Sequence, residues 1–197
     1  MKRRIILGSA SPRRRELLSQ IGVEFEVLVS GGEERYTDNE PEKIVKELAL
    51  VKAENVANEL EKKQGCVVIG ADTVVVLDGK ILGKPKDKED AFRMLKDLQG
   101  REHQVYTGTA ILNYDTTDMK QVIQHAERTE VFVHAMTEEE IFKYIETGEP
   151  MDKAGSYGIQ GRFAAHVDRI DGDYYSVVGL PVAYLYQQLK MLGAIER

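Results

Sequence analysis

The stretch of sequence that decides the fold runs from Val67 to Leu77 and reads Val-Val-Ile-Gly-Ala-Asp-Thr-Val-Val-Val-Leu. Apolar residues occupy both alternating sets of positions, which is typical of a strand buried on both faces of a sheet. Asp78-Gly79 follows directly and predicts a hairpin turn into a short strand at 80–82. The middle of the chain is therefore expected to form the centre of a sheet.

Helical and strand patterns intermix on either side of this stretch. Toward the N-terminus we expect a strand at 3–8, a helix at 12–21, a strand at 23–29, a loop at 30–39 and a helix at 41–62. Toward the C-terminus we expect a helix at 88–98, a long hairpin from 103–114 and 121–133, a helix from 137 with a capping box to Glu140, an irregular glycine-rich region at 148–179 and a helix at 181–191. This order predicts an α/β protein with a mixed sheet and flanking helices.

Composition narrows the classes of function. A length of 197 residues suits a single domain, and we treat residues 1–197 as one. The net charge of −6 argues against binding long nucleic acid, and no apolar run is long enough for a membrane helix. Cys66 is the only cysteine, so no intramolecular disulfide forms, and no export signal is recognised. We expect a cytoplasmic protein with Cys66 buried in its core, and a homodimer is left open.

The segment Ser9-Ala10-Ser11-Pro12-Arg13-Arg14-Arg15 breaks the expected pattern of a helix start. Ser11 suits the N-cap and Pro12 the first helical position. Three arginines then occupy the first turn, where the positive end of the helix dipole disfavours cations. A bound phosphate would offset that cost, because free N–H groups at a helix N-terminus bind anions. The alternative is an exposed basic turn.

Two charged residues stand in apolar surroundings. Lys52 falls on the apolar stripe of the helix at 41–62, four residues from Leu48 and four from Val56. It must extend to solvent, pair with a carboxylate or meet a ligand. Asp72 lies inside the buried strand, where an unpaired carboxylate is costly, so it meets a cleft, a metal or a cation, or forms a structural ion pair. Gly70 lies two residues earlier on the same strand face and could let a ligand approach.

Weaker signals lie in the loops. Glu33 and Glu34 follow the second strand, Gly83-Lys84-Pro85 follows the short hairpin, and Asp152 to Arg162 is rich in glycine. The four histidines show no metal-ligand spacing, and each is read as ordinary surface or core polarity. The chain contains neither a P-loop nor a Gly-x-Ser-x-Gly elbow.

Taken together, these segments resemble the Maf family of nucleotide pyrophosphatases over essentially the whole chain. The matching pieces, besides the arginine segment and Glu33-Glu34, are Lys52-Ala53, Gly70-Ala71-Asp72-Thr73, Gly83-Lys84-Pro85, Lys153-Ala154-Gly155-Ser156-Tyr157-Gly158-Ile159-Gln160-Gly161 and Asp171 to Pro181. The resemblance implies two lobes around a central cleft along a mixed sheet. It also implies release of pyrophosphate from nucleoside triphosphates, with dTTP and UTP as the substrates of the Tyr-Gly-Ile-Gln-Gly branch, and a link to septum formation.

The resemblance also implies roles for individual residues. Asp72 matches the proton acceptor, while Arg13, Thr73 and Gln160 match positions that set base preference. We therefore expect catalytic roles for Asp72, Lys84 and Lys52, and substrate binding by Ser9, Arg13, Arg14, Thr73, Lys153 and Gln160. Glu34 and Asp72 are the expected ligands of a divalent cation, Mg²⁺ or Mn²⁺, with Glu33 the alternative to Glu34. Asp72 could act as general base or mainly as metal ligand.

Two rival functions remain at this stage. A nucleotide-binding regulator of cell division with little turnover would need the same phosphate-binding cations. An RNA-binding module would need a basic stripe and exposed aromatic residues, which a charge of −6 and 7% aromatic residues do not favour. A general-base candidate inside a strand favours the enzyme.

Overall fold

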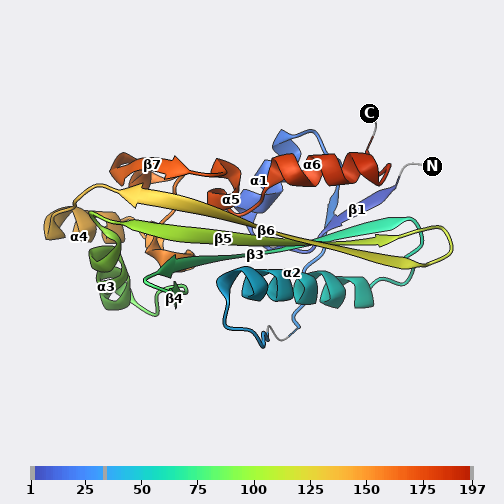
Figure 1. Cartoon of the computed structure of the whole chain (residues 1–197), viewed down its shortest axis with the longest axis horizontal. Coiled ribbons are helices and arrows are strands. Elements are labelled where there is room, and N and C mark those ends of the chain that lie inside the picture. The colour runs from blue at the N-terminus through green and yellow to red at the C-terminus, as the bar shows by residue number, and fades with distance from the viewer. Residues whose placement is uncertain (1–2, 33–34, 196–197) are drawn as a thin grey trace. The chain divides into compact units, whose positions relative to one another are not determined.

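The computed structural model describes residues 3–32 and 35–195. Seven strands form one mixed sheet in the order β2-β1-β3-β5-β6-β7, and β4 pairs with β3 off this path. Strands β1 (Arg4–Leu7), β2 (Glu26–Val27) and β3 (Cys66–Leu77) run parallel, whereas β4 (Lys80–Leu82) is antiparallel to β3. Strands β5 (Glu102–Tyr114) and β6 (Lys120–Val133) form the expected hairpin, and β7 (Val167–Asp171) is antiparallel to β6 (Figure 1). The mixed α/β prediction is confirmed.

The chain divides into two compact units, and β3, β5 and β6 each continue from one into the other. Unit 1 comprises residues 1–72, 107–127 and 179–197, and unit 2 comprises residues 73–106 and 128–178. Within β3, Asp72 is the last residue of unit 1 and Thr73 the first of unit 2.

Unit 1 covers its strands with three helices. Helix α2 (Pro41–Asn58) lies on one side, and α1 (Pro12–Gln20) and α6 (Val182–Met191) lie on the other (Figure 1). The core between α2 and the sheet includes Ile6, Val68, Ala110 and Leu112, all buried. Cys66 belongs to the same core, as expected.

Unit 2 contains α3 (Lys88–Leu98) and α4 (Glu138–Glu146), whose Phe92 and Phe142 rings stack with centroids 4.6 Å apart. Thr137 and Glu140 form the expected capping box at the start of α4. Three short 3₁₀ helices follow: η1 (Glu149–Asp152), η2 (Ala154–Ser156) and η3 (Arg162–His166). Asp78 and Gly79 both have positive φ, of 49° and 74°, as a type I′ hairpin turn requires.

Several boundaries predicted from the sequence are wrong. The second strand is only Glu26–Val27, two exposed residues that pair with β1, instead of 23–29. Helix α2 ends at Asn58 instead of 62, where the Glu59 amide closes a tight turn onto Val56 O. The region 148–179 is not irregular throughout, because it contains β7 and α5 (Tyr174–Val178). Pairing with β6 stabilises β7, and the Asp173 carboxylate accepts from the Ser176 amide at 2.9 Å to start α5.

Candidate functional site

The two anomalous charges of the sequence, Lys52 and Asp72, bind each other. Lys52 Nζ donates to Asp72 Oδ1 at 2.6 Å, and the two side chains are 21% and 12% exposed. Of the alternatives that the sequence left open, the structure therefore shows pairing with an opposite charge for both residues. A carboxylate and an ammonium held together in a largely apolar setting keep strong electrostatic fields, because little water screens them.

Close packing of α2 on the sheet brings this pair together. A Cβ atom on Gly70 would lie 2.2 Å from Ala49 O and 2.8 Å from Ala53 N. The backbone of α2 therefore contacts β3 directly at Gly70, which has no side chain to keep the helix away. Gly108 of β5 performs the same task farther along α2, since a Cβ there would lie 2.1 Å from Val45 O. The expectation that Gly70 makes room for a ligand is wrong, because the helix backbone occupies that space.

The arginine segment opens α1 as expected, and Arg14 already has hydrogen-bond partners within the protein. Ser11 is at the N-cap without a side-chain capping bond, and buried Ser9 accepts from the Ser11 amide through Oγ at 3.3 Å. Arg14 donates from Nε to Gly179 O at 2.8 Å and from Nη1 to Ser9 Oγ at 3.3 Å. Arg14 thus ties the start of α1 to the segment before α6, while Arg13 is half-buried beside it.

The predicted residues of unit 2 lie on β3 and on two loops. Thr73 is half-buried in β3, and Lys84 and Gln160 are exposed. The Gly155 amide donates to Gly83 O at 3.1 Å, which joins the Lys84 loop to the glycine-rich loop. Lys153 donates from Nζ to Glu149 O and to Asp152 Oδ1, each at 2.7 Å. A Cβ on Gly155 would lie 2.9 Å from the side chain of Val75 in β3, so this loop lies directly against the strand.

Sequence reasoning missed a buried pair beside the glycine-rich loop. His103 and Tyr157 are joined by a hydrogen bond of 2.7 Å between His103 Nε2 and the Tyr157 hydroxyl, and His103 is fully buried. Burial lowers the pKa of His103 to about 4, and His103 Nδ1 has no hydrogen-bond partner in the described part of the chain. Burial also raises the pKa of Tyr157. A histidine at the start of a strand gives no sequence signal for such a partner 54 residues away.

Of the expected metal ligands, Asp72 is the one that lies among the described residues. Among residues 3–32 and 35–195, no group of three or more His, Cys, Asp or Glu side chains could hold a metal ion. Glu33 and Glu34, the expected acidic ligands, lie outside the described residues. Asp72 remains, and a single carboxylate is a common protein ligand for Mg²⁺ when phosphate oxygens and water complete the shell.

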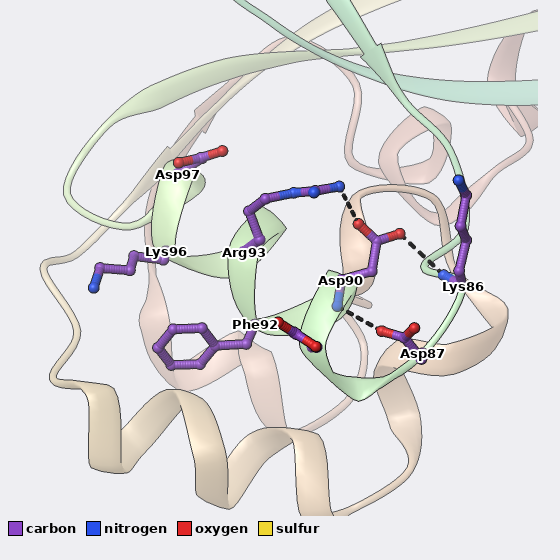
Figure 2. Close-up of a pocket in the computed structure, with 8 residues that line it drawn as sticks. Lys86, Asp87, Asp90, Phe92, Arg93, Lys96 and Asp97 are labelled. Atoms are coloured by element: carbon purple, nitrogen blue, oxygen red, sulfur yellow. Dashed lines mark hydrogen bonds and ion pairs between the residues drawn. The ribbon is translucent and has the colours of Figure 1, made fainter.

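A surface pocket over α3 contains none of the predicted site residues. Figure 2 shows that Asp90 lies at the centre of a small network of hydrogen bonds in this pocket. Asp90 accepts from the Arg93 guanidinium and from the Lys86 amide, and its own amide donates to Asp87 Oδ1 at 2.8 Å. Asp90, the most buried carboxylate of the pocket, is therefore already satisfied by Arg93 and the Lys86 amide.

These features define a mixed-sheet α/β protein with a carboxylate–ammonium pair set into an apolar strand. Its sequence matches the model of the Maf family, described as Maf-like protein, over residues 4–192. The chain belongs to this family.

Two curated relatives are named dTTP/UTP pyrophosphatase. One, from Agathobacter rectalis, is 54% identical, and the match covers 96% of this chain and 97% of that protein. Another, from a Thermoanaerobacter species, is 51% identical and covers 95% of each. Among solved structures, the Staphylococcus aureus Ham1 protein is 19% identical with a TM-score of 0.43, covering 65% of this chain and 71% of that one. No helix in the described parts of the chain is both long and apolar enough to cross a bilayer.

Proposed function

We propose that this chain hydrolyses dTTP and UTP to the corresponding monophosphate and pyrophosphate. The observation that carries the proposal is the Lys52–Asp72 pair, at 2.6 Å, in the strand where the sequence predicts a general base. Relatives about half identical over nearly the whole chain are named for this activity, which supports an enzyme over a regulator that only binds nucleotide.

In the proposed reaction, Asp72 accepts a proton from the water that attacks the α-phosphorus. The new bond joins the water oxygen to this phosphorus, and the bond to the oxygen bridging the α- and β-phosphorus breaks, so pyrophosphate leaves. Lys52 orients the Asp72 carboxylate and places a positive charge near the phosphate oxygens, where charge grows in the transition state. A Mg²⁺ or Mn²⁺ ion brought by the triphosphate and bound by Asp72 would neutralise further charge there.

We assign a catalytic role to Lys84 as well, and we assign Ser9, Arg13, Arg14, Thr73, Lys153 and Gln160 to substrate binding. Ser9, Arg13 and Arg14 lie at the N-terminus of α1, a position suited to phosphate. Lys84 and Lys153 lie on loops of unit 2 that are joined by a hydrogen bond between Gly155 and Gly83. Thr73, next to Asp72 in β3, and Gln160 are the residues to which we assign recognition of the base.

The test is to measure pyrophosphate release from each common triphosphate with Mg²⁺ or Mn²⁺, including modified pyrimidine nucleotides. We expect release from dTTP and UTP at higher kcat/KM than from ATP or GTP. Protein purified in the same way with Asp72→Asn serves as control for contaminating hydrolases. Tight binding of nucleotides without turnover would instead support the regulator. The proposed compartment is the reducing cytoplasm, where such substrates are found and the lone Cys66 stays a thiol.

A further inference from the structure

The turn that carries Gln160 is held by side chains from outside it. Gln160 itself is exposed, but its neighbours Tyr157, Ile159 and Phe163 are buried. The rings of Tyr157 and Phe163 pack in a tilted arrangement with centroids 4.6 Å apart, and the Tyr144 hydroxyl accepts from the Gly158 amide at 3.2 Å. The start of the turn is therefore fixed by α4 and by aromatic packing.

Glu149 holds the end of the same turn. Both of its carboxylate oxygens accept from the Arg162 amide, at 3.0 and 3.2 Å. Its backbone oxygen accepts from Lys153 Nζ at 2.7 Å. One residue, at the first position of η1, thus contacts Lys153 on one side and the end of the Gln160 turn on the other.

Gly161 makes this contact possible. A Cβ atom there would lie 2.2 Å from Glu149 Oε2, so the carboxylate fits only against a residue without a side chain. Gly161 has φ −92°, a value that every residue adopts, so conformational freedom does not explain this glycine. Room for the Glu149 carboxylate does explain it.

We propose that Glu149 is a positioning residue for base selection, acting through the Gln160 turn. This inference rests on the proposed function for its substrates. Glu149 acts by fixing the backbone on which Gln160 stands, so that the amide meets the edge of the pyrimidine in one geometry. The Lys153 ammonium binds the backbone oxygen of Glu149, so this contact is expected to persist in Glu149→Ala, whereas the carboxylate acts on the turn.

The structure offers two independent ways to break this contact. Glu149→Ala removes the acceptor, and Gly161→Ala pushes the carboxylate away while leaving Glu149 in place. Glu149→Gln keeps one acceptor oxygen and is the conservative rescue. Glu146→Ala is the matched control, because Glu146 is an exposed carboxylate on α4 that pairs with Lys88 at 2.9 Å instead of with the turn.

The experiment compares kcat/KM for UTP and GTP, with hydrogen exchange of the peptide covering residues 157–163. We expect Glu149→Ala and Gly161→Ala each to reduce the UTP/GTP ratio about tenfold, mainly through a higher KM for UTP, and to speed exchange of the Arg162 amide. The double variant should be no worse than either single one, since both remove the same contact. Glu149→Gln should recover most of the ratio, and Glu146→Ala should match wild type.

The outcomes separate the two proposals. If wild type releases no pyrophosphate from pyrimidine triphosphates, the proposed function fails, and hydrogen exchange alone then decides whether Glu149 holds the turn. If wild type is selective and both variants keep its UTP/GTP ratio, the inference is overturned. A lower Tm with an unchanged ratio would likewise overturn it, because that pattern indicates a contribution to stability only.

Discussion

Asp72 and Gln160, the residues assigned to the reaction and to the base, are held in opposite ways. Asp72 lies in a long apolar run, and α2 packs on this part of the sheet so closely that a glycine is needed in β3 and another in β5. Gln160 lies on an exposed turn whose position depends on hydrogen bonds from Tyr144 and Glu149. The first setting is built from regular elements, and the second from individual side-chain contacts.

This difference indicates how easily substitutions can alter each of the two positions. A strand buried under a helix fixes a charged pair firmly, because moving either element would disrupt close packing along its whole length. A loop can be altered residue by residue without disturbing the sheet. We infer that the chemistry is tied to the core of unit 1, while base preference depends on a few replaceable contacts in unit 2.

The largest effect is expected for Asp72→Asn, which tests the rigid half of this comparison. Removing the proton acceptor should lower turnover of UTP by about 10²–10⁴-fold. The fold should survive, because an amide fits the same space and can still accept from Lys52. Pyrophosphate release together with circular dichroism checks both statements. A variant that is folded and as fast as wild type would remove Asp72 from the reaction.

The second prediction concerns the pH dependence of stability that buried His103, the partner of Tyr157 in the glycine-rich loop, confers on the fold. The pKa of His103 is lowered from 6.5 to about 4, so the folded state favours the neutral ring. The stability from this burial is complete above pH 6.5 and is lost as the pH falls through the window toward 4, because the unfolded state binds the proton first. The loss amounts to about 3 kcal/mol over that window, at 1.36 kcal/mol per pKa unit.

The measurement is the free energy of unfolding at several pH values, in wild type and in His103→Gln. Carboxylates that titrate in the same pH range contribute equally to the free energy of unfolding of both proteins, so their contribution cancels when the two are subtracted. We expect the wild-type free energy to fall more steeply between pH 6.5 and 4 than that of the variant. Parallel pH dependences in the two proteins would mean that His103 is not held neutral by burial.

Gly70→Ala and Gly108→Ala form the next test, because both force α2 away from the sheet. Overpacking of this kind costs about 1–3 kcal/mol, so each variant should unfold more easily. Gly70 lies beneath Ala49 and Ala53, next to Lys52, whereas Gly108 lies beneath Val45, about two turns away. A misplacement of the Lys52–Asp72 pair should cost Gly70→Ala about 10²-fold in kcat, and Gly108→Ala much less. Equal losses of kcat at matched stability would show that the position of the pair does not govern the rate.

Lys52→Met is expected to destabilise the fold, although the sequence alone suggests that it would restore an apolar stripe. In the structure, this change leaves the Asp72 carboxylate without its 2.6 Å partner. We expect a loss of about 2 kcal/mol, below the ~3–5 kcal/mol of a fully buried pair, because the two side chains keep some exposure. Adding Asp72→Asn should recover most of the stability. Urea denaturation of the two single variants and the double variant tests this, and additive losses would exclude the pairing.

The sequence predicted several elements of both units because their signals are local. The apolar run around Asp72, the Pro41 helix start and the Asp78-Gly79 turn each act within a few residues, and each formed as expected. The interpretation of Gly70 failed because the neighbour that fills its space, Ala49, comes from a helix whose placement no local pattern gives.

Unit 2 was harder to predict because its contacts are long-range. Strand β7 forms through pairing with β6, about 40 residues earlier. The His103–Tyr157 bond spans 54 residues, and the contact of Glu149 with Arg162 leaves no mark except the unexplained Gly161. Resemblance to the Maf family identified Gln160, but only the structure shows what holds its turn in place.

The smallest effect is expected for Gln160→Ala, which tests the replaceable half of the comparison. A glutamine amide both donates and accepts, which matches the N3–H and O4 edge of uracil or thymine. A site that makes such hydrogen bonds discriminates against bases that leave its polar groups unpaired. Losing one such bond should reduce the preference for UTP over GTP about tenfold, or ~1.4 kcal/mol, with the best rate nearly unchanged. A role in merely holding the loop together is disfavoured, because the Gln160 side chain is exposed while Tyr144 and Glu149 supply the bonds that fix the turn. Competition between equal concentrations of UTP and GTP measures the preference directly, with Gln187→Ala, an exposed glutamine on α6, as the matched control. An unchanged preference in Gln160→Ala would assign base recognition to other residues, with Arg13 and Thr73 the next to be tested.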